Sequence, residues 1–230
     1  MKHLKLFETT NEYNNWLNSD NFITPYTIKN KSNNSIIYQI KLPYDKEILY
    51  LESNGTQYID TNIIYNGSYR FEVKFLCNSL SSPDDANSGT IFGTRTYPEI
   101  DSFQLSTYKS GCFGYNGLTS NLGITTNTEY ITEFKRDNKL YINNVEKLTL
   151  DNKSFNTVEP ILLFGLYQRS NVTERFLGRI YYFKLYDEND NIILDMIPVR
   201  KNGIGYMYDK VSKQLFSNQG TGNFVLGTDK

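Results

Sequence analysis

Alternating apolar and polar side chains dominate the sequence from about residue 48 onward. Over residues 69–75 the odd positions are Tyr, Phe, Val and Phe, while the even positions are Arg, Glu and Lys. A period of two places the apolar side chains on one face, so this segment is predicted to be a half-buried strand. Residues 161–166 are apolar throughout, which predicts a strand buried on both faces.

Turn-forming residues divide the rest of this region into further strands. Asp137-Asn138 and Asn143-Asn144 are predicted to form two-residue hairpin turns, because Asn and Asp accept positive φ. The strands predicted with them cover residues 130–136, 139–142, 145–150, 176–186 and 192–199, with a hairpin region over 203–226. At least ten strands in about 180 residues predict an antiparallel β-sandwich of the jelly-roll kind.

Residues 1–45 carry a different pattern. Thr9 and Glu12 have capping-box spacing, and Tyr13, Trp16 and Leu17 then fall on one face of a short helix. Strands are predicted over residues 3–7, 26–29 and 36–40, which makes a small β-α-β-β unit. A unit of this size buries little surface by itself, so we expect residues 1–45 to dock onto the main domain or onto a partner and residues 46–230 to form the main domain.

Composition agrees with a β-rich protein and excludes several functions. The chain has 19 Tyr, 14 Phe and one Trp, residues that favour strands, and a single Ala, the best helix former. Its 24 basic and 25 acidic residues leave a net charge of −1. This balance disfavours nucleic acid and an anionic membrane surface as partners.

The residues of common catalytic and metal chemistry are scarce. His3 is the only histidine, and Cys77 and Cys112 are the only cysteines. They cannot supply a zinc site or a Cys–His pair in the main domain, so no cofactor and no metal are expected. The two cysteines are expected to be free thiols, as in proteins made in a reducing cytoplasm.

Several segments resemble one known family. Residues 51–61 (LESNGTQYIDT) look like the opening of the laminin-G-like, concanavalin-A-like jelly rolls found in proteins of gut bacteria and their phages. The later segments that resemble the same family are 178–186, 197–203, 205–209 and 215–218. Residues 4–13 are similar to short adaptor units that head structural proteins of Bacteroides phages, including the crAss-like phages.

The resemblance implies a phage virion structural protein: a capsid decoration, a head fibre or a tail-associated protein. Residues 1–45 would dock onto other virion proteins, and the lectin-like domain would be displayed on the virion surface, where it adheres weakly to host or mucus glycans. A homo-oligomer is expected, because surface proteins of this kind assemble symmetrically. No export signal is recognised near Met1, so synthesis in the bacterial host cytoplasm is expected.

Two alternative functions remain open. The second candidate is a bacterial carbohydrate-binding protein, and the third is a glycoside hydrolase. Sugars bind to flat aromatic rings with a few directed polar groups, and such residues occur in or beside predicted loops. The candidates for a glycan site are Tyr97, Tyr108, Tyr115, Asn116, Tyr167 and Arg169. The candidates for the docking interface are Phe7, Tyr13 and Trp16.

One segment is similar to a catalytic motif. Jelly-roll glycosidases of the laminarinase type carry Glu-x-Asp-x-x-Glu, with a nucleophile first and an acid/base last. Here Glu99 and Asp101 are present, but the last position is Gln104. An amide cannot cycle a proton, so no hydrolysis is expected and no catalytic residue is assigned.

Two oxygen-rich loops, residues 82–87 and 187–191, have the composition of calcium ligands. Neither follows a calcium-loop spacing, and Asp and Asn are ordinary turn residues. Both are therefore predicted to be turns without a metal.

Overall fold

The computed structural model describes residues 27–29, 36–39, 42–84, 88–96, 101–153 and 155–230. The chain divides into two compact units, Met1–Asp45 and Lys46–Lys230. In the first, β1 (Thr27–Lys29) pairs antiparallel with β2 (Ile36–Gln39), close to the two strands predicted there. The predicted helix and the docking residues Phe7, Tyr13 and Trp16 lie outside the described residues.

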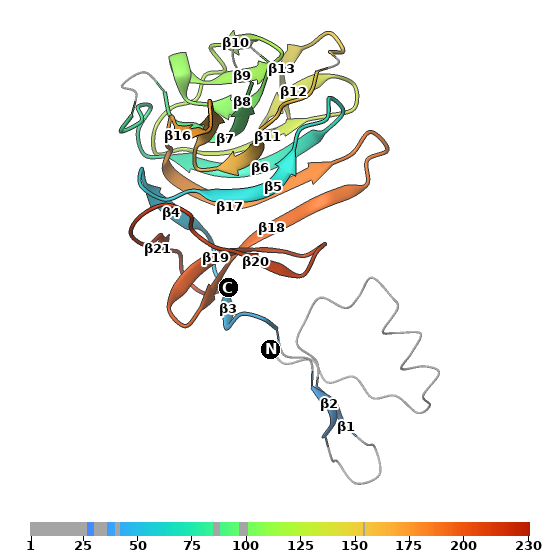
Figure 1. Cartoon of the computed structure of the whole chain (residues 1–230), viewed down its shortest axis with the longest axis vertical. Coiled ribbons are helices and arrows are strands. Elements are labelled where there is room, and N and C mark those ends of the chain that lie inside the picture. The colour runs from blue at the N-terminus through green and yellow to red at the C-terminus, as the bar shows by residue number, and fades with distance from the viewer. Residues whose placement is uncertain (1–26, 30–35, 40–41, 85–87, 97–100, 154) are drawn as a thin grey trace. The chain divides into compact units, whose positions relative to one another are not determined.

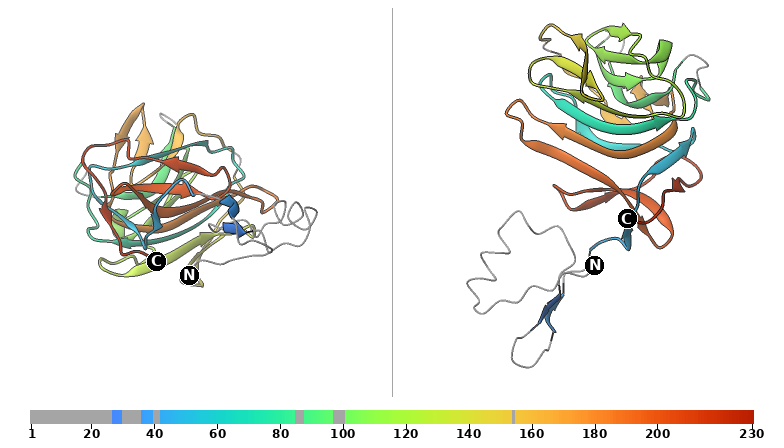
Figure 2. Two further views of the ribbon diagram at one scale, coloured as in Figure 1. Left: turned by 90° about the horizontal axis from the view of Figure 1, so that it is seen from below. Right: turned by 180° about the vertical axis from the view of Figure 1, so that it is seen from behind.

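The second unit contains two sheets that lie face to face (Figures 1 and 2). The smaller sheet has eight strands, in the order β10 (Leu118–Ser120), β9 (Cys112–Tyr115), β8 (Ser102–Ser106), β7 (Thr90–Arg95), β14 (Pro160–Leu163) and β5 (Ile59–Ile64), with β15 (Leu166–Gln168) and β16 (Asn171–Thr173) off this path.

The larger sheet has eleven strands, in the order β13 (Val145–Thr149), β12 (Lys139–Ile142), β11 (Glu129–Phe134), β6 (Arg70–Cys77), β17 (Leu177–Tyr186), β18 (Ile192–Lys201), β19 (Ile204–Asp209) and β20 (Gln214–Phe216). Three short strands join it off this path: β3 (Lys46–Glu47), β4 (Leu51–Asn54) and β21 (Val225–Leu226). The pairings within this sheet are antiparallel, so the fold is the predicted jelly-roll-like β-sandwich.

The core between the sheets consists largely of aromatic rings. The alternation predicted on β6 is present, because Phe71, Val73 and Phe75 are buried while the charged residues between them are partly exposed. From the smaller sheet, Phe92 approaches Phe71 with ring centroids 4.6 Å apart, and Phe103 stacks on Tyr65 at 4.2 Å. Such ring pairs add about 0.5–1.5 kcal/mol each beyond the burial of their area.

The two predicted hairpin turns differ. Asn143 and Asn144 have φ values of 49° and 63° and form the predicted two-residue turn. The prediction for Asp137-Asn138 is wrong in length: Lys135 pairs with Lys139, so Arg136, Asp137 and Asn138 form the loop. Asn138 alone has a positive φ, 58°, which is typical of a type I turn that ends in a left-handed residue.

The apolar run 161–166 is buried, as predicted, but it is not one strand. Phe164 has a φ of 65°, and this bend separates β14 from β15. β14 pairs antiparallel with β7, whereas β15 returns to pair with the end of β7 in parallel. After the bend, Leu166 lies close to Gly93 of β7.

The described part of the chain contains no α-helix: its regular structure outside the strands is a single 3₁₀ turn, Tyr108–Ser110. None of the helical structure found there has the length and apolar character needed to cross a membrane.

Candidate functional site

A row of small and polar residues crosses the smaller sheet on the face that points away from the core. Strand alternation places Phe103 and Leu105 of β8 in the core, so Ser102, Gln104 and Ser106 point to the opposite face. In the strand register Gln104 lies between Gly93 of β7 and Gly114 of β9, and Leu118 of β10 continues the row. Gln104 is only 1% exposed, although the second sheet does not cover this face.

The two glycines leave room for the Gln104 side chain to lie flat. A Cβ atom at Gly93 would stand 2.4 Å from the Gln104 Cβ, and one at Gly114 would stand 2.8 Å from its Cγ. Both distances are shorter than real Cβ contacts. A larger residue on either side would therefore displace Gln104, so the sequence reserves this space for it.

An ion pair fixes the orientation of the Gln104 amide. Arg95 Nη2 donates to Gln104 Oε1 at 2.9 Å, and Arg95 Nη1 donates to Glu174 Oε1 at 3.2 Å. Thr90 Oγ1 donates to Glu174 Oε2 at 2.9 Å. The acceptor oxygens are thus occupied, and the Gln104 amide nitrogen donates to no described residue.

Further polar atoms here lack hydrogen-bond partners among the described residues. Ser102 Oγ, Ser106 Oγ and Arg95 Nε are fully buried and unpaired. Leaving one such group unpaired costs about 1–3 kcal/mol. Buried polar groups of this kind are completed by ordered water, an ion or a ligand, so this face is a candidate for a binding site.

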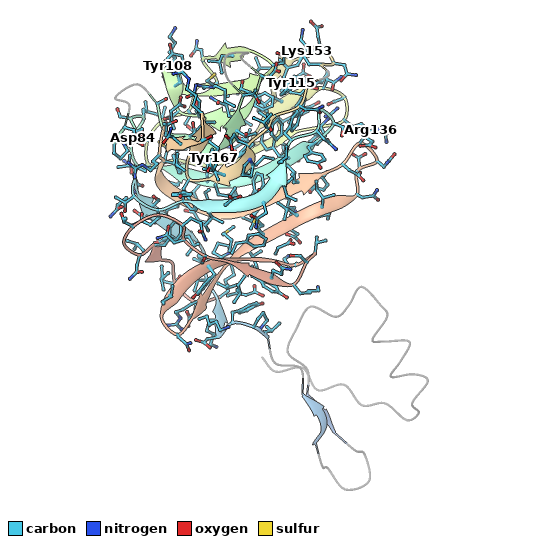
Figure 3. All side chains as sticks on the ribbon, viewed as in Figure 1. Asp84, Tyr108, Tyr115, Arg136, Lys153 and Tyr167 are labelled. Carbon is cyan, nitrogen blue, oxygen red and sulfur yellow. The ribbon has the colours of Figure 1, made fainter. Side chains whose placement is uncertain are left out.

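A pocket of about 190 Å³ opens over Gln104. We call it the Gln104 pocket; its lining residues are Ser88, Arg95, Gln104, Ser106, Tyr108, Cys112, Leu118 and Glu174. Tyr108 (labelled in Figure 3) is half-buried at the edge of this pocket. The Lys109 ammonium lies 5.1 Å from the centre of the Tyr108 ring. The pocket therefore combines polar groups with aromatic and aliphatic walls.

A second pocket, of about 250 Å³, lies beyond the β9–β10 turn. We call it the Lys153 pocket; its lining residues are Tyr115, Asn116, Gly117, Leu118, Thr149, Leu150, Asp151 and Lys153. In Figure 3 Tyr108 and Lys153 lie at the same end of the sandwich, on either side of the β9–β10 hairpin that Figure 1 labels. Leu118 lines both pockets.

Tyr115 is a core residue at the base of the Lys153 pocket. Its ring packs against Phe134 and Phe155 with centroids 4.9 and 5.5 Å apart, and the residue is 5% exposed. Its hydroxyl is 3.3 Å from the Lys153 carbonyl oxygen, to which it donates. A ring as buried as this one cannot stack on a sugar.

Of the six residues predicted for a glycan site, the five that the structure describes do not all line one of the two pockets. Tyr108 lines the Gln104 pocket, and Tyr115 and Asn116 line the Lys153 pocket. Tyr167 and Arg169 belong to the β15–β16 hairpin and line neither of these two pockets. Burial, and then the nearby Glu159 carboxylate, raise the pKa of Tyr167. Tyr97 lies outside the described residues.

Sequence reasoning missed Arg95 and Glu174, which hold Gln104 in place. They are far apart in the sequence and share no motif, so their pairing appears only in the fold. The signal available in the sequence is the pattern of residues 102–106, Ser-Phe-Gln-Leu-Ser, which alternates polar and apolar side chains. The structure shows that this strand is fully buried. A polar face with no exposure is the mark of a covered or ligand-binding surface.

The two oxygen-rich loops are structural where they are described. Asp84 accepts from Arg175 Nε at 2.8 Å, and the hydrogen bonds from Arg175 lower the pKa of that carboxyl. Asp187 accepts from the backbone amides of Asn189 and Asn191 at 2.8 and 2.9 Å, which closes its turn. Within the described ranges no group of three or more His, Cys, Asp or Glu residues could hold a metal ion.

Comparison with known proteins supports the fold. The sequence matches no protein-family model and no curated protein. Among solved structures, the chain is similar to one described as "a putative carbohydrate binding protein from Bacteroides ovatus", with a TM-score of 0.56 and 13% identity. The match covers 86% of this chain but 65% of that one, less than two thirds of its length. The likeness therefore establishes a shared β-sandwich.

Proposed function

We propose that the Lys46–Lys230 unit is a non-catalytic carbohydrate-binding domain and that the Gln104 pocket holds a sugar. The proposal rests on the hydrogen bonding of the Gln104 amide. Arg95 holds the oxygen of the Gln104 amide, which leaves the amide nitrogen of this pocket-lining residue without a partner among the described residues, and Gly93 and Gly114 leave room for the side chain on either side. The similar fold of the Bacteroides ovatus protein agrees with it.

The groups around the pocket suit a hydroxylated ligand. The Gln104 amide nitrogen is a donor with no partner in the described part of the chain, and Ser106, whose buried hydroxyl is unpaired there, also lines the pocket. Tyr108 and Leu118 offer apolar walls to the C–H face of a sugar ring. A volume of about 190 Å³ is below that of a drug-sized site and fits a single ring.

The same pocket is poorly equipped for hydrolysis. Glycosidases use two carboxyl groups about 5–9.5 Å apart. The described lining residues include one carboxylate, Glu174, and Arg95 and Thr90 occupy both of its oxygens. Glu99 lies outside the described residues. We therefore expect no release of reducing sugar from β-glucan or bacterial capsular polysaccharide.

The test compares Gln104→Glu with Gln214→Glu. The first keeps the shape of the side chain and its contact with Arg95 but removes the amide donor. The second makes the same charge change at an exposed position on β20. On a glycan array, followed by calorimetry with the glycans retained, Q104E is expected to bind roughly 10–100-fold more weakly, and Q214E is expected to match the unmodified protein.

Two results would count against this function. Equal binding by Q104E and the unmodified protein would place the sugar elsewhere. Release of reducing sugar by the unmodified protein would make it a hydrolase; the same release by Q104E alone would show that Gln104 is what silences a catalytic motif. Circular dichroism checks that both variants remain folded.

We further propose that this domain is displayed on a phage particle. The support is the resemblance of residues 4–13 to virion adaptor units together with the division of the chain after Asp45, which leaves a separate unit for docking. Mass spectrometry of purified phage particles should then find the chain with the other virion proteins. Its presence only in bacterial envelope fractions would favour a bacterial carbohydrate-binding protein instead.

A further inference from the structure

We infer that the Gln104 pocket and the Lys153 pocket are adjoining subsites for one linear oligosaccharide, which crosses Leu118. This inference rests on the proposed function and names the class of ligand: a chain of several sugars rather than a single terminal residue. Its basis is the side chain that both pockets share and the surface around it.

Leu118 is an exposed apolar residue between two polar hollows. Its side chain lies on the same sheet face as Gln104, in register with Gly114, and 47% of the residue is exposed. Gln104 and Leu118 are two strands apart, about 9.6 Å in an ordinary sheet. An aliphatic ridge of this kind offers a contact to the C–H face of a sugar that links the rings in the two pockets.

The backbone beside Leu118 is open. Asn116 and Gly117 form the tight turn between β9 and β10, with φ values of 47° and 126°. A Cβ atom at Gly117 would meet no described atom within 4 Å, so the space beside that position is open in the described part of the chain. Gly117 lines the Lys153 pocket, so this open space adjoins that pocket.

The Lys153 pocket offers polar groups of its own. Asn116 and Thr149 face it from β-hairpins of different sheets, and the Lys153 ammonium is 4.0 Å from the Asp151 carboxylate, a long and exposed ion pair. Such a pair is worth little in water and rearranges at low cost around a ligand. These groups can therefore bind hydroxyls of the second sugar.

The test uses ladders of one to six sugar units prepared from laminarin, from bacterial capsular polysaccharide and from mucin glycans, with the full chain. Thr149→Trp fills the Lys153 pocket from β13. Lys147→Trp adds the same side chain to an exposed position of that strand, outside both pockets, and is the matched control. Q104E reports on the Gln104 pocket.

For the unmodified protein, affinity should rise at least tenfold from one unit to the longer members of a ladder. T149W should remove that increase and keep the affinity for one unit, while K147W should keep both. Equal affinity for all lengths, or an increase that T149W preserves, would overturn the two-subsite inference.

The same data separate this inference from the proposed function. Loss of binding in Q104E with an unaffected T149W would retain the carbohydrate site and reject only its extension. Binding of no ladder, or binding that Q104E leaves unchanged, would contradict the proposed function together with the inference. Circular dichroism and the thermal midpoint establish that each variant is folded.

Discussion

The Gln104 side chain fits its position because its neighbours on either side, Gly93 and Gly114, have no side chains. Arg95 donates a hydrogen bond to the oxygen of the Gln104 amide. Gln104, which stands where the laminarinase-type motif has its acid/base Glu, is thus held in place by several contacts. We assign it the role of directing its amide nitrogen toward a ligand.

Adding a single methyl group to the floor should weaken binding. In Gly114→Ala the new Cβ would lie 2.6 Å from Ser102 Oγ and 2.8 Å from Gln104 Cγ, so both side chains must move. We expect sugar affinity to fall about tenfold and the free energy of unfolding to fall by about 1–3 kcal/mol. In the control, Gly165→Ala, the nearest atom is a Val172 methyl at 3.3 Å. Calorimetric affinities that are equal for the two variants would contradict the role of Gly114.

The two cysteines should be inert in the folded protein. Both are buried free thiols, and burial raises the pKa of Cys77 to about 12. At pH 8 roughly one Cys77 in 10,000 is then a thiolate, the reactive form. Alkylation by iodoacetamide should therefore follow global unfolding, with both sites modified together in urea. Rapid modification of Cys77 in the native protein would show that its strand opens locally.

The strands in which apolar and polar side chains clearly alternate were predictable, because one face of each lies on the core. The positions that were not predictable are where the chain bends. The run 161–166 has no periodicity, so nothing in it marks Phe164 as the residue with positive φ that separates β14 from β15. Only after that bend do Leu166 approach Gly93 and β15 pair with β7.

In the candidate site, too, some residues were predictable from the sequence and others were not. Tyr108 was among the predicted glycan-site residues and does line the Gln104 pocket. Arg95 and Glu174 were not predicted, because their contact depends on the β15–β16 segment returning to the start of β7. Tyr115 was predicted from its residue type, which does not distinguish a surface ring from one in the aromatic core.

The β12–β13 hairpin gives a test of the turn assignment. Asn143 and Asn144 both have positive φ, which costs an ordinary residue about 1–2 kcal/mol. Asn144→Ala should lower the free energy of unfolding by about 1 kcal/mol, whereas Asn144→Gly should leave it equal or slightly higher. Urea unfolding measures both. Equal stability of the alanine and glycine variants would mean that the turn relaxes into another conformation.

At the scale of the whole molecule, acid should destabilise the fold through specific carboxylates. Hydrogen bonds from Arg175 lower the pKa of Asp84. Burial raises the pKa of Glu72, but hydrogen bonds from Tyr182 and Lys184 outweigh it and lower the pKa overall. The unfolded chain therefore binds protons more readily, and the free energy of unfolding should fall as the pH drops through about 4 and below.

Asp84→Asn should reduce this acid sensitivity. Urea unfolding at pH 7 and pH 3 should show a smaller difference in the free energy of unfolding for D84N than for the unmodified chain. Asp151, whose side chain is 92% exposed, is the control, and D151N should keep the full difference. The same difference in all three proteins would remove Asp84 from the explanation.

The two units of the chain should also differ in stability. The hydrophobic core described here belongs to Lys46–Lys230, so a chain of residues 46–230 should fold alone. Its urea transition should match the main transition of the full chain. A sandwich that unfolds when residues 1–45 are removed would show that the boundary at Asp45 is wrong and that the two units depend on each other.

A sugar is expected to bind over Gln104. Nuclear magnetic resonance of the full chain tests this, with side-chain amide and Arg Nε–H signals followed as the oligosaccharide with the highest affinity is added. We expect the Gln104 amide and the Arg95 Nε–H signals to shift along the binding curve while the exposed Gln214 amide stays fixed. Unchanged Gln104 and Arg95 signals, with shifts confined to the larger sheet, would contradict it.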